Sequence, residues 1–201
     1  MQLPKPIEEF VKLFSSFPSI GQRQATRLAF YLVNQKKEKI KETIKAIEAL
    51  EKEISICKEC FLPFYNPKGK EKLCPICSDP RRKKDIICVV EKETDLLTIE
   101  NSHQYNGLYH ILGGVISPTD PESYKKLKVK SLLVRIKKNK VKEIIIATNP
   151  TTAGDLTAMY LEKVLKEAGV KISRLGRGLP TGGEIEFADP ETIASALKRR
   201  E

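Results

Sequence analysis

The sequence predicts an α/β protein with a helical N-terminal region, a cysteine-rich middle segment, a parallel-sheet domain and a C-terminal helical segment. Three observations predict this class. Apolar residues recur every three or four positions in the first third, two Cys-x-x-Cys pairs follow, and continuous apolar runs then alternate with helical patterns. The chain has 201 residues, 40% of them apolar, which is enough for one or two domains with buried cores.

Three helices are predicted within the first 54 residues. The first apolar stripe begins at Ile7 and is ended by Pro18, the second follows Gly21, and the third spans about residues 37–54. We therefore expect this region, residues 1–54, to be helical throughout.

The turn that contains Gly21 is a candidate anion site. Backbone N–H groups at the start of the following helix are expected to face outward there, and such groups bind phosphates. Arg23 and Arg27 lie one turn apart on the same helix, where they would add electrostatic affinity without reading bases. We predict phosphate binding at this turn, with an ordinary helical hairpin and solvated arginines as the alternative.

Four cysteines predict a structural zinc site. Cys57 and Cys60 form one pair and Cys74 and Cys77 the other, with 13 residues between the pairs. Four thiolates at this spacing can surround one Zn²⁺ tetrahedrally, which leaves no position for water or substrate. Disulfides are disfavoured in a reducing compartment. A redox dithiol would need only one Cys-x-x-Cys pair, whereas this chain has two. The fifth cysteine, Cys88, lies in an apolar run and is expected to be a small buried side chain.

After residue 85, buried strands and helices alternate, as they do in a parallel sheet covered by helices. The charged run of residues 81–84 precedes this change. A Gly-rich loop at residues 176–183 and a helix from about residue 190 complete the chain. The predicted strands are residues 86–90, 109–112, 143–148 and 170–175, and the predicted helices between them are residues 95–101, 124–138 and 154–168.

Acidic residues lie close to the carboxyl ends of two predicted strands, where open parallel sheets bind ligands. Glu91 and Asp95 follow the first strand, and Asp155 lies on the helix after the strand at residues 143–148. A two-metal phosphoryl-transfer site needs several carboxylates, yet Asn149 and Thr151 are neutral. We therefore expect the three acidic residues to cap helices and bind partners rather than hold catalytic Mg²⁺.

The net charge of +10 is concentrated in the first part of the chain. Residues 1–84 contain 18 basic and 10 acidic residues, a surplus of 8, whereas residues 85–201 contain 18 and 16, a surplus of 2. An uneven positive charge favours a polyanion such as nucleic acid, with a lysine-rich solubilising surface as the other explanation.

The order of these parts resembles the bacterial recombination mediator family RecR over nearly the whole chain. In that family a helix-hairpin-helix motif, here residues 18–27, precedes a four-cysteine zinc finger and a Toprim domain. The resemblance implies a helix-hairpin-helix region at 1–54, a zinc finger at 55–80, a Toprim domain at 81–176 and a C-terminal oligomerisation segment at 177–201. The strings similar to the family are Ile87-Cys88-Val89-Val90-Glu91, Tyr109-His110-Ile111-Leu112-Gly113-Gly114, Ile116-Ser117-Pro118, Ala147-Thr148-Asn149-Pro150 and Arg177-Gly178-Leu179-Pro180.

The resemblance implies a non-catalytic DNA clamp in recombinational repair. Subunits would pair into a dimer or a ring-like tetramer around single- and double-stranded DNA, and would act with RecO and RecF to help load RecA at single-stranded gaps. One Zn²⁺ per chain is the implied cofactor. By position, the DNA-contacting residues would be Gly21, Arg23 and Arg27, and the partner-binding residues Glu91, Asp95 and Asp155.

Two other functions remain open. One is a Mg²⁺-dependent Toprim nuclease or topoisomerase-like enzyme using the three acidic residues, and the other is a zinc-stabilised adaptor with a merely solubilising basic face. His103 and His110 have no motif spacing to a nucleophile and are expected to be surface or packing residues. No apolar run is long enough for a membrane span or a signal peptide, so we expect a cytoplasmic protein without membrane contact.

Overall fold

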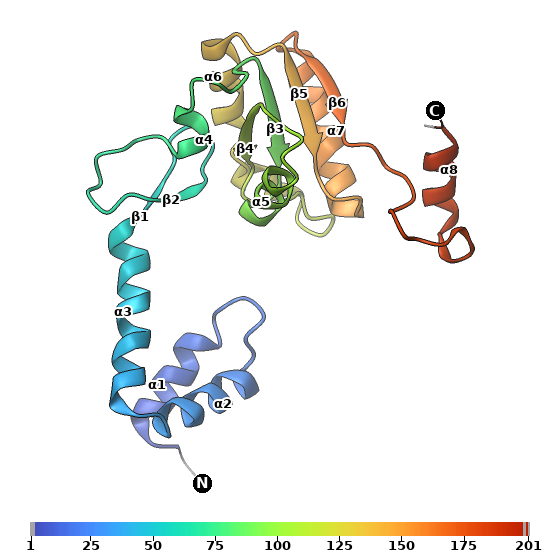
Figure 1. Ribbon diagram of the computed structural model, residues 1–201. Coiled ribbons are helices and arrows are strands. Elements are labelled where there is room, and N and C mark those ends of the chain that lie inside the picture. The colour runs from blue at the N-terminus through green and yellow to red at the C-terminus, as the bar shows by residue number, and fades with distance from the viewer. Residues whose placement is uncertain (1–2, 199, 201) are drawn as a thin grey trace. The chain divides into compact units, whose positions relative to one another are not determined.

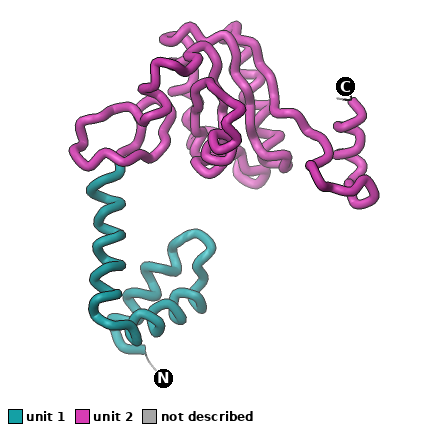
Figure 2. The backbone as a smooth tube through the Cα atoms, viewed as in Figure 1, with its two compact units in different colours: residues 1–54 teal, residues 55–201 magenta. Residues whose placement is uncertain are grey.

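The chain divides at Ile54 into two compact units, residues 1–54 and residues 55–201 (Figure 2). A computed structural model describes residues 3–198 and residue 200, and Figure 1 shows the order of its elements. Among these described residues, no helix has the length and apolar character needed to cross a bilayer.

The N-terminal unit consists of three helices, α1 (Lys5–Phe14), α2 (Gln22–Val33) and α3 (Lys37–Glu53). Val11, Ala25 and Ala29 form a small buried core between α1 and α2. The three predicted helices are confirmed, but α1 ends four residues before Pro18. After Phe14 the chain continues as turns, and the hydroxyl groups of the two serines that follow donate to backbone carbonyls of the last helical turn.

The cysteine-rich segment contains little regular structure. Its elements are the short strands β1 (Ile54–Ile56) and β2 (Pro63–Tyr65), which pair with each other, and the four-residue helix α4 (Pro75–Ser78). The four paired cysteines and Phe64 form its buried centre. The prediction of an irregular segment is therefore confirmed, apart from these short elements.

A four-stranded sheet forms the centre of the second unit. Its strand order is β4-β3-β5-β6, with β3 (Ile86–Val90), β4 (Leu108–Ile111), β5 (Glu143–Ala147) and β6 (Lys171–Arg174). All neighbouring strands are parallel. The predicted parallel α/β arrangement is confirmed, and it places the carboxyl ends of β3 and β5 side by side because Val90 pairs with Ala147.

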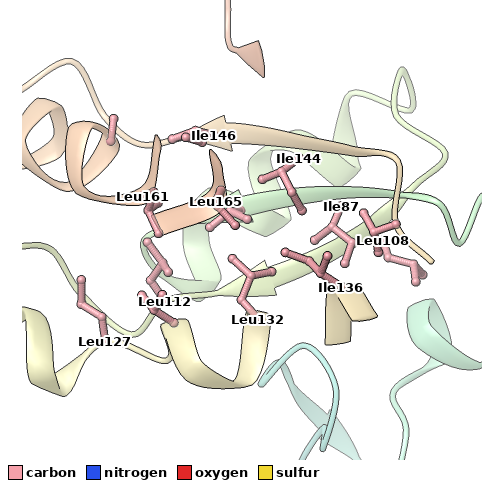
Figure 3. Packing of buried hydrophobic residues seen from close by; sticks show 14 of the residues in the cluster. Ile87, Leu108, Leu112, Leu127, Leu132, Ile136, Ile144, Ile146, Leu161 and Leu165 are labelled. Atoms are coloured by element: carbon pink, nitrogen blue, oxygen red, sulfur yellow. The ribbon is translucent and has the colours of Figure 1, made fainter. Parts of the chain in front are cut away.

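The two faces of the sheet have different covers. Ile87 and Val89 point to a large apolar core formed with α6 (Val129–Asn139) and α7 (Thr152–Lys166), part of which is shown in Figure 3. Cys88 and Val90 point to the other face, where α5 (Glu93–Asn101) and side chains from the cysteine-rich segment pack. Because side chains along β3 point alternately to the two faces of the sheet, one strand contacts α6 and α7 on one face and the cysteine-rich segment on the other.

The predicted helix at residues 124–138 is wrong in its first part. Residues Pro121–Lys126 form a 3-10 helix, and α6 begins only at Val129. Leu127 is extended, and the N–H of Lys128 donates to the carbonyl of Leu112 at 3.0 Å. This contact with the end of β4 takes the chain out of helical geometry. At the C-terminus a short 3-10 helix, Ile185–Phe187, precedes α8 (Pro190–Lys198).

Candidate functional site

The four cysteines of the two Cys-x-x-Cys pairs converge on one point. The Sγ atoms of Cys57, Cys60, Cys74 and Cys77 all lie within 4.8 Å of one another, and those of Cys60 and Cys74 are 3.5 Å apart. In a tetrahedral site with Zn–S distances of about 2.3 Å, the sulfur atoms are ~3.8 Å apart. Four buried thiols without any oxygen donor form a set that fits a soft or borderline metal such as zinc. The predicted convergence of these residues is confirmed.

Arg135 places a buried positive charge beside this cluster, where it would balance part of the charge of a bound metal–thiolate group. Four thiolates around a divalent ion carry a net charge of −2, which is unfavourable in a buried site. The guanidinium group of Arg135, only 3% exposed, donates to Cys77 Sγ at 3.4 Å. The backbone N–H of Cys74 donates to Cys57 Sγ at 3.4 Å, so two of the sulfur atoms receive hydrogen bonds from the protein.

The same guanidinium group connects the cysteine cluster to the sheet. Arg135 also donates to the carbonyl oxygen of Tyr109 at 2.5 Å and pairs with Glu59 at 3.1 Å. Glu59 lies between the first two cysteine ligands and also pairs with Lys138 of α6 at 2.7 Å. Arg135 is not predictable as a functional residue from the sequence, because an arginine within an amphipathic helix carries no signal that it is buried.

Backbone and apolar contacts fix the cysteine segment further. The N–H of Ile111, at the end of β4, donates to the carbonyl of Cys60 at 3.0 Å. Phe61, Leu62 and Ile76 pack against the apolar cluster on the α5 face of the sheet. The four-cysteine cluster is therefore joined to the sheet by backbone hydrogen bonds and apolar contacts, so a change at the cluster should alter the end of β4.

The N-terminal unit presents the predicted arginine pair on an open surface. A shallow hollow of about 690 Å³ is lined by Arg23, Arg27 and their neighbours Gln22, Gln24 and Thr26. Both arginines are exposed, and neither forms an ion pair within the described part of the chain. The N–H of Gly21 already donates to the side chain of Gln24 at 3.0 Å, so it is not available to an anion in this structure.

The acidic residues at the carboxyl edge of the sheet do not converge on one point. Glu91, 8% exposed, accepts hydrogen bonds on both carboxylate oxygens from Asn149, one from its backbone N–H and one from its side-chain amide, each at 2.7 Å. This bidentate contact clamps the loop between β5 and α7 onto the end of β3. Both oxygens of Glu91 are thus engaged by the protein itself.

Asp95 and Asp155 each have separate partners. Asp95 accepts from the backbone N–H of Lys92 at 3.2 Å and so caps α5, as expected. The same expectation of a helix cap is not met by Glu91, whose two oxygens bind Asn149. Asp155 pairs with Arg174 at 2.5 Å and with Arg177. The hydrogen bond from Arg177 is the main cause of a lowered pKa for Asp155, so this carboxyl stays ionised.

A cavity of about 810 Å³ lies at this edge of the sheet. Its wall includes Asp95, Asn149, Arg174 and Arg177, together with Thr192 of α8. The wall also includes Asp189 and Glu191, so three carboxylates face two arginines, and Glu191 pairs with Arg177 at 3.7 Å. Two positive charges within the same wall do not suit a site for two divalent cations, which needs several carboxylates directed at the ions.

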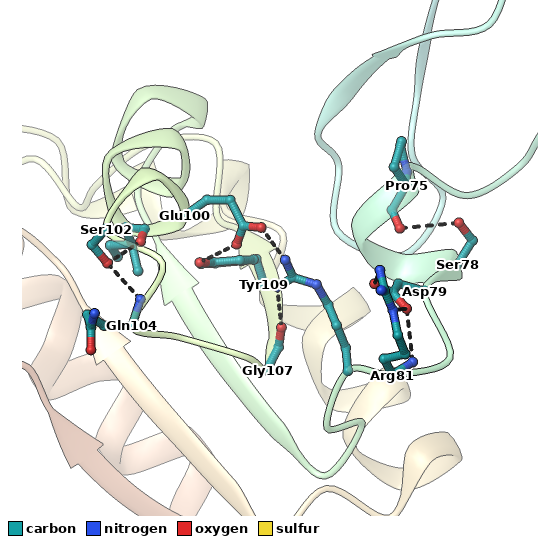
Figure 4. A network of polar contacts seen from close by, with 11 residues as sticks. Pro75, Ser78, Asp79, Arg81, Glu100, Ser102, Gln104, Gly107 and Tyr109 are labelled. Atoms are coloured by element: carbon teal, nitrogen blue, oxygen red, sulfur yellow. Dashed lines mark hydrogen bonds and ion pairs between the residues drawn. The ribbon is translucent and has the colours of Figure 1, made fainter.

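Part of the basic run at residues 81–84 has a structural role. Arg82 donates to the carbonyl of Gly107 at 3.0 Å and pairs with Glu100, which in turn accepts from the hydroxyl group of Tyr109 at 2.9 Å (Figure 4). Arg81 pairs with Asp79 at 2.9 Å. Two of the four charges in the run are therefore balanced within the domain.

A parallel sheet with this strand order, joined to a four-cysteine cluster and flanked by helical ends, fits the class of Toprim-domain proteins. The model for the Toprim domain matches residues 85–176, and the model for "RecR, C-terminal" matches residues 178–201. The chain belongs to the RecR family of recombination proteins, and the comparisons with individual relatives support this over its full length.

Three relatives, each named "Recombination protein RecR", illustrate the similarity. The one from Lactococcus lactis subsp. lactis is 42% identical over 201 residues, covering 100% of this chain and 98% of the relative. The one from Anaeromyxobacter sp. is 40% identical with the same coverage. The one from Clostridium perfringens is 40% identical over 197 residues, covering 98% of this chain and 96% of the relative. The resemblance inferred from the sequence strings is therefore confirmed.

Proposed function

We propose that the protein is a non-catalytic DNA-binding mediator of recombinational repair, with a helix-hairpin-helix motif in the N-terminal unit as its duplex contact. The observation that carries this proposal is that Arg23 and Arg27 are exposed beside the hollow at the start of α2 and form no ion pair with any residue that the structure describes. Two cations one helical turn apart can flank a phosphate of any sequence. Membership in a family of recombination proteins supports a DNA ligand for this surface.

The metal in the four-cysteine centre is, in this proposal, one Zn²⁺ held by all four thiolates. With four protein ligands the ion supplies structure and no open coordination position. The residues of the chain then exclude water from the sulfur atoms, donate hydrogen bonds to two of them and connect the centre to β4. Because thiolates must stay reduced to bind zinc, the cytoplasm is the compartment that suits this function.

The proposed partners are RecO and RecF, with which the protein would help load RecA at single-stranded gaps. Asp155 and Asp95 are the candidate contact residues at the surface, and Glu91 would act by holding the neighbouring loop in place. A single helical hairpin is a small phosphate-binding surface, so we expect several copies to act together in a dimer or ring-like tetramer. We propose residues 177–201 as the oligomerisation segment.

Fluorescence anisotropy on a gapped duplex tests the DNA contact. Wild-type protein is expected to bind with an affinity that falls steeply with salt, and the Arg23→Ala, Arg27→Ala double variant is expected to bind at least about tenfold more weakly, with a shallower salt dependence. Circular dichroism verifies that the variant is folded. Equal binding by both proteins would mean that α2 is not the contact surface.

A cleavage assay tests the enzymatic alternative. Because Glu91 and Asp155 are engaged by Asn149 and by two arginines, we expect linear and supercoiled DNA to stay intact with the protein and Mg²⁺. Reproducible nicking that disappears in Glu91→Gln would favour the Toprim nuclease or topoisomerase-like function instead.

A further inference from the structure

The last residue of β2 and the loop after it, residues 65–72 of the cysteine-rich segment, form a largely exposed basic surface that the functions above do not use. We call it the tip loop. It carries Lys68, Lys70 and Lys72, all exposed. Lys58 lies beside its far end, because the N–H of Lys58 donates to the carbonyl of Lys72 at 3.1 Å. Four lysines are thus gathered on one short stretch of surface.

A buried asparagine holds the tip loop in one conformation. Asn66, 5% exposed, donates from its side-chain amide to Ser55 Oγ at 3.1 Å and to the carbonyl of Glu71 at 2.9 Å. Its side-chain oxygen accepts from the N–H of Glu71, and its backbone carbonyl accepts from the N–H of Gly69 at 2.9 Å. The lysines therefore sit on an ordered frame, which lowers the entropy lost when a ligand binds.

The positive charge of the tip loop is not balanced locally. None of its three lysines, nor Lys58, forms an ion pair with any residue that the structure describes. Glu59, the acidic residue next to Lys58, is turned away toward Arg135 and Lys138. Only Glu71 opposes the lysines, so the surface keeps a net positive charge that suits a polyanion.

An aromatic ring stands at the start of the same loop. Along β2 the side chains alternate, so that Phe64 is buried among the cysteines while Tyr65 is 68% exposed. An exposed aromatic ring beside unpaired lysines is the combination used to bind single strands, where bases stack on the ring and cations follow the phosphates. The core of an interface with a folded protein is usually depleted in lysine, so this lysine-rich surface suits such a partner less well.

From these observations we propose that the tip loop binds an unpaired nucleic-acid strand, with Tyr65 as a stacking platform and Lys68, Lys70 and Lys72 as phosphate contacts. This inference rests on the proposed function as a DNA-binding protein and adds a second contact to it. The arginines of α2 contact backbone phosphates and do not require exposed bases, whereas stacking on Tyr65 requires bases that are not paired. The tip loop would therefore distinguish the gap from the flanking duplex.

Anisotropy with a fluorescent oligo(dT) strand and with a fully paired duplex tests this inference on the full-length, zinc-loaded protein. Tyr65→Ala is expected to weaken oligo(dT) binding by about 5- to 150-fold, as the loss of one stacked base does, and to leave duplex binding unchanged. Tyr65→Phe keeps the ring and should bind oligo(dT) like the wild type.

The contribution of the three lysines to strand binding is measured with the triple variant Lys68→Ala, Lys70→Ala, Lys72→Ala. Removing three phosphate contacts is expected to reduce the slope of log affinity against log salt for oligo(dT) by about 2. The matched control is Lys137→Ala, Lys163→Ala, Lys166→Ala, which removes the same charge from exposed, unpaired lysines of α6 and α7. Its salt slope should stay close to that of the wild type.

The outcomes separate the two proposals. If oligo(dT) binding is the same for wild type, Tyr65→Ala and the tip-loop triple variant, the inference fails even if the α2 double variant loses duplex binding. If the α2 variant binds duplex normally while the tip-loop variants lose oligo(dT), the proposed duplex contact fails and the tip loop stands. Equal losses in the triple variant and its control would show a general charge effect and overturn the inference. Unchanged strand binding combined with loss of an interacting protein would assign the tip loop to a protein partner.

Discussion

Arg135 shows how a single buried cation determines the local electrostatics of the second unit. Its guanidinium group contacts a cysteine sulfur, a backbone carbonyl of β4 and the carboxylate of Glu59. Removal of a buried partner of this kind leaves polar groups without hydrogen bonds, which is more destabilising than loss of an exposed ion pair. The effect should reach the metal as well as the sheet.

Replacement of Arg135 is therefore expected to lower the affinity of the four-cysteine centre for its metal ion. In Arg135→Met, the four-cysteine centre loses the donor to Cys77 Sγ, and we expect metal affinity to fall by about 10- to 100-fold, as for other outer hydrogen-bond partners of metal ligands. The rate of metal release to a chromogenic chelator measures this, and a shift of the cobalt-to-thiolate absorption band reports the sulfur environment. Lys138→Ala, which removes only the exposed partner of Glu59, is the control and should release metal as the wild type does.

His110 is expected to make stability depend on pH. The residue is fully buried, its Nε2 donates to the carbonyl of Lys128 at 2.9 Å, and burial lowers its pKa from 6.5 to about 4. Between these two values the unfolded chain binds a proton that the folded protein does not bind. The free energy of unfolding should therefore fall as the pH drops from 6.5 toward 4, by about 3 kcal/mol in total, and be unaffected by this residue above pH 7.

Urea denaturation at several pH values compares the wild type with His110→Gln, whose side-chain amide can still donate to Lys128. Other groups titrate in both proteins, so the difference between the two pH profiles isolates the histidine. Parallel profiles between pH 7 and pH 4.5 would contradict this assignment.

At the scale of elements, the junction of β5 with α7 depends on a close approach of two backbones. A Cβ atom added at Gly154 would lie 2.1 Å from the carbonyl oxygen of Asn149 and 3.0 Å from Glu91 Oε1. This first turn of α7 therefore accepts only glycine without movement of the loop that Glu91 clamps.

Gly154→Ala is expected to lower the free energy of unfolding by about 2–3 kcal/mol, since overpacking of a tight junction has an effect of this size. Denaturant melts measure it. Gly178→Ala is a suitable control because no atom lies within 4 Å of the position of its Cβ, and its stability should be unchanged within about 0.5 kcal/mol.

Local sequence patterns predicted the elements well where each pattern had a single structural solution. The apolar run of β3 was buried on both faces as expected, and the four paired cysteines came together. The break before α6 was not predictable, because it depends on the contact of Lys128 with the end of β4 rather than on periodicity. The roles of Arg135 and Asn66 were not predictable for the same reason. Arg135 donates to the backbone of a residue far away in the sequence, and Asn66 donates to a backbone carbonyl, which carries no sequence signal.

For the whole molecule, the division at Ile54 predicts an uneven response to metal removal. A chelator should abolish hydrogen-exchange protection at the amides of Cys57, Phe61 and Ile111, whose hydrogen bonds belong to or depend on the cysteine-rich segment. The helices α1 and α2 have their own small core and should keep their protection. Mass-spectrometric exchange on the intact chain measures both, and simultaneous loss in the two units would contradict their independence.

The pairing of Asn149 with Glu91 also has a consequence for chemical ageing. An asparagine usually deamidates after the backbone nitrogen of the next residue attacks its side-chain amide, and Pro150 has no hydrogen on that nitrogen. This usual route from asparagine to aspartate is therefore blocked at residue 149 by the residue that follows it. Glu91 therefore keeps a neutral hydrogen-bond donor at 2.7 Å instead of facing a second negative charge. The contact between Asn149 and Glu91 is thus protected from this form of chemical ageing.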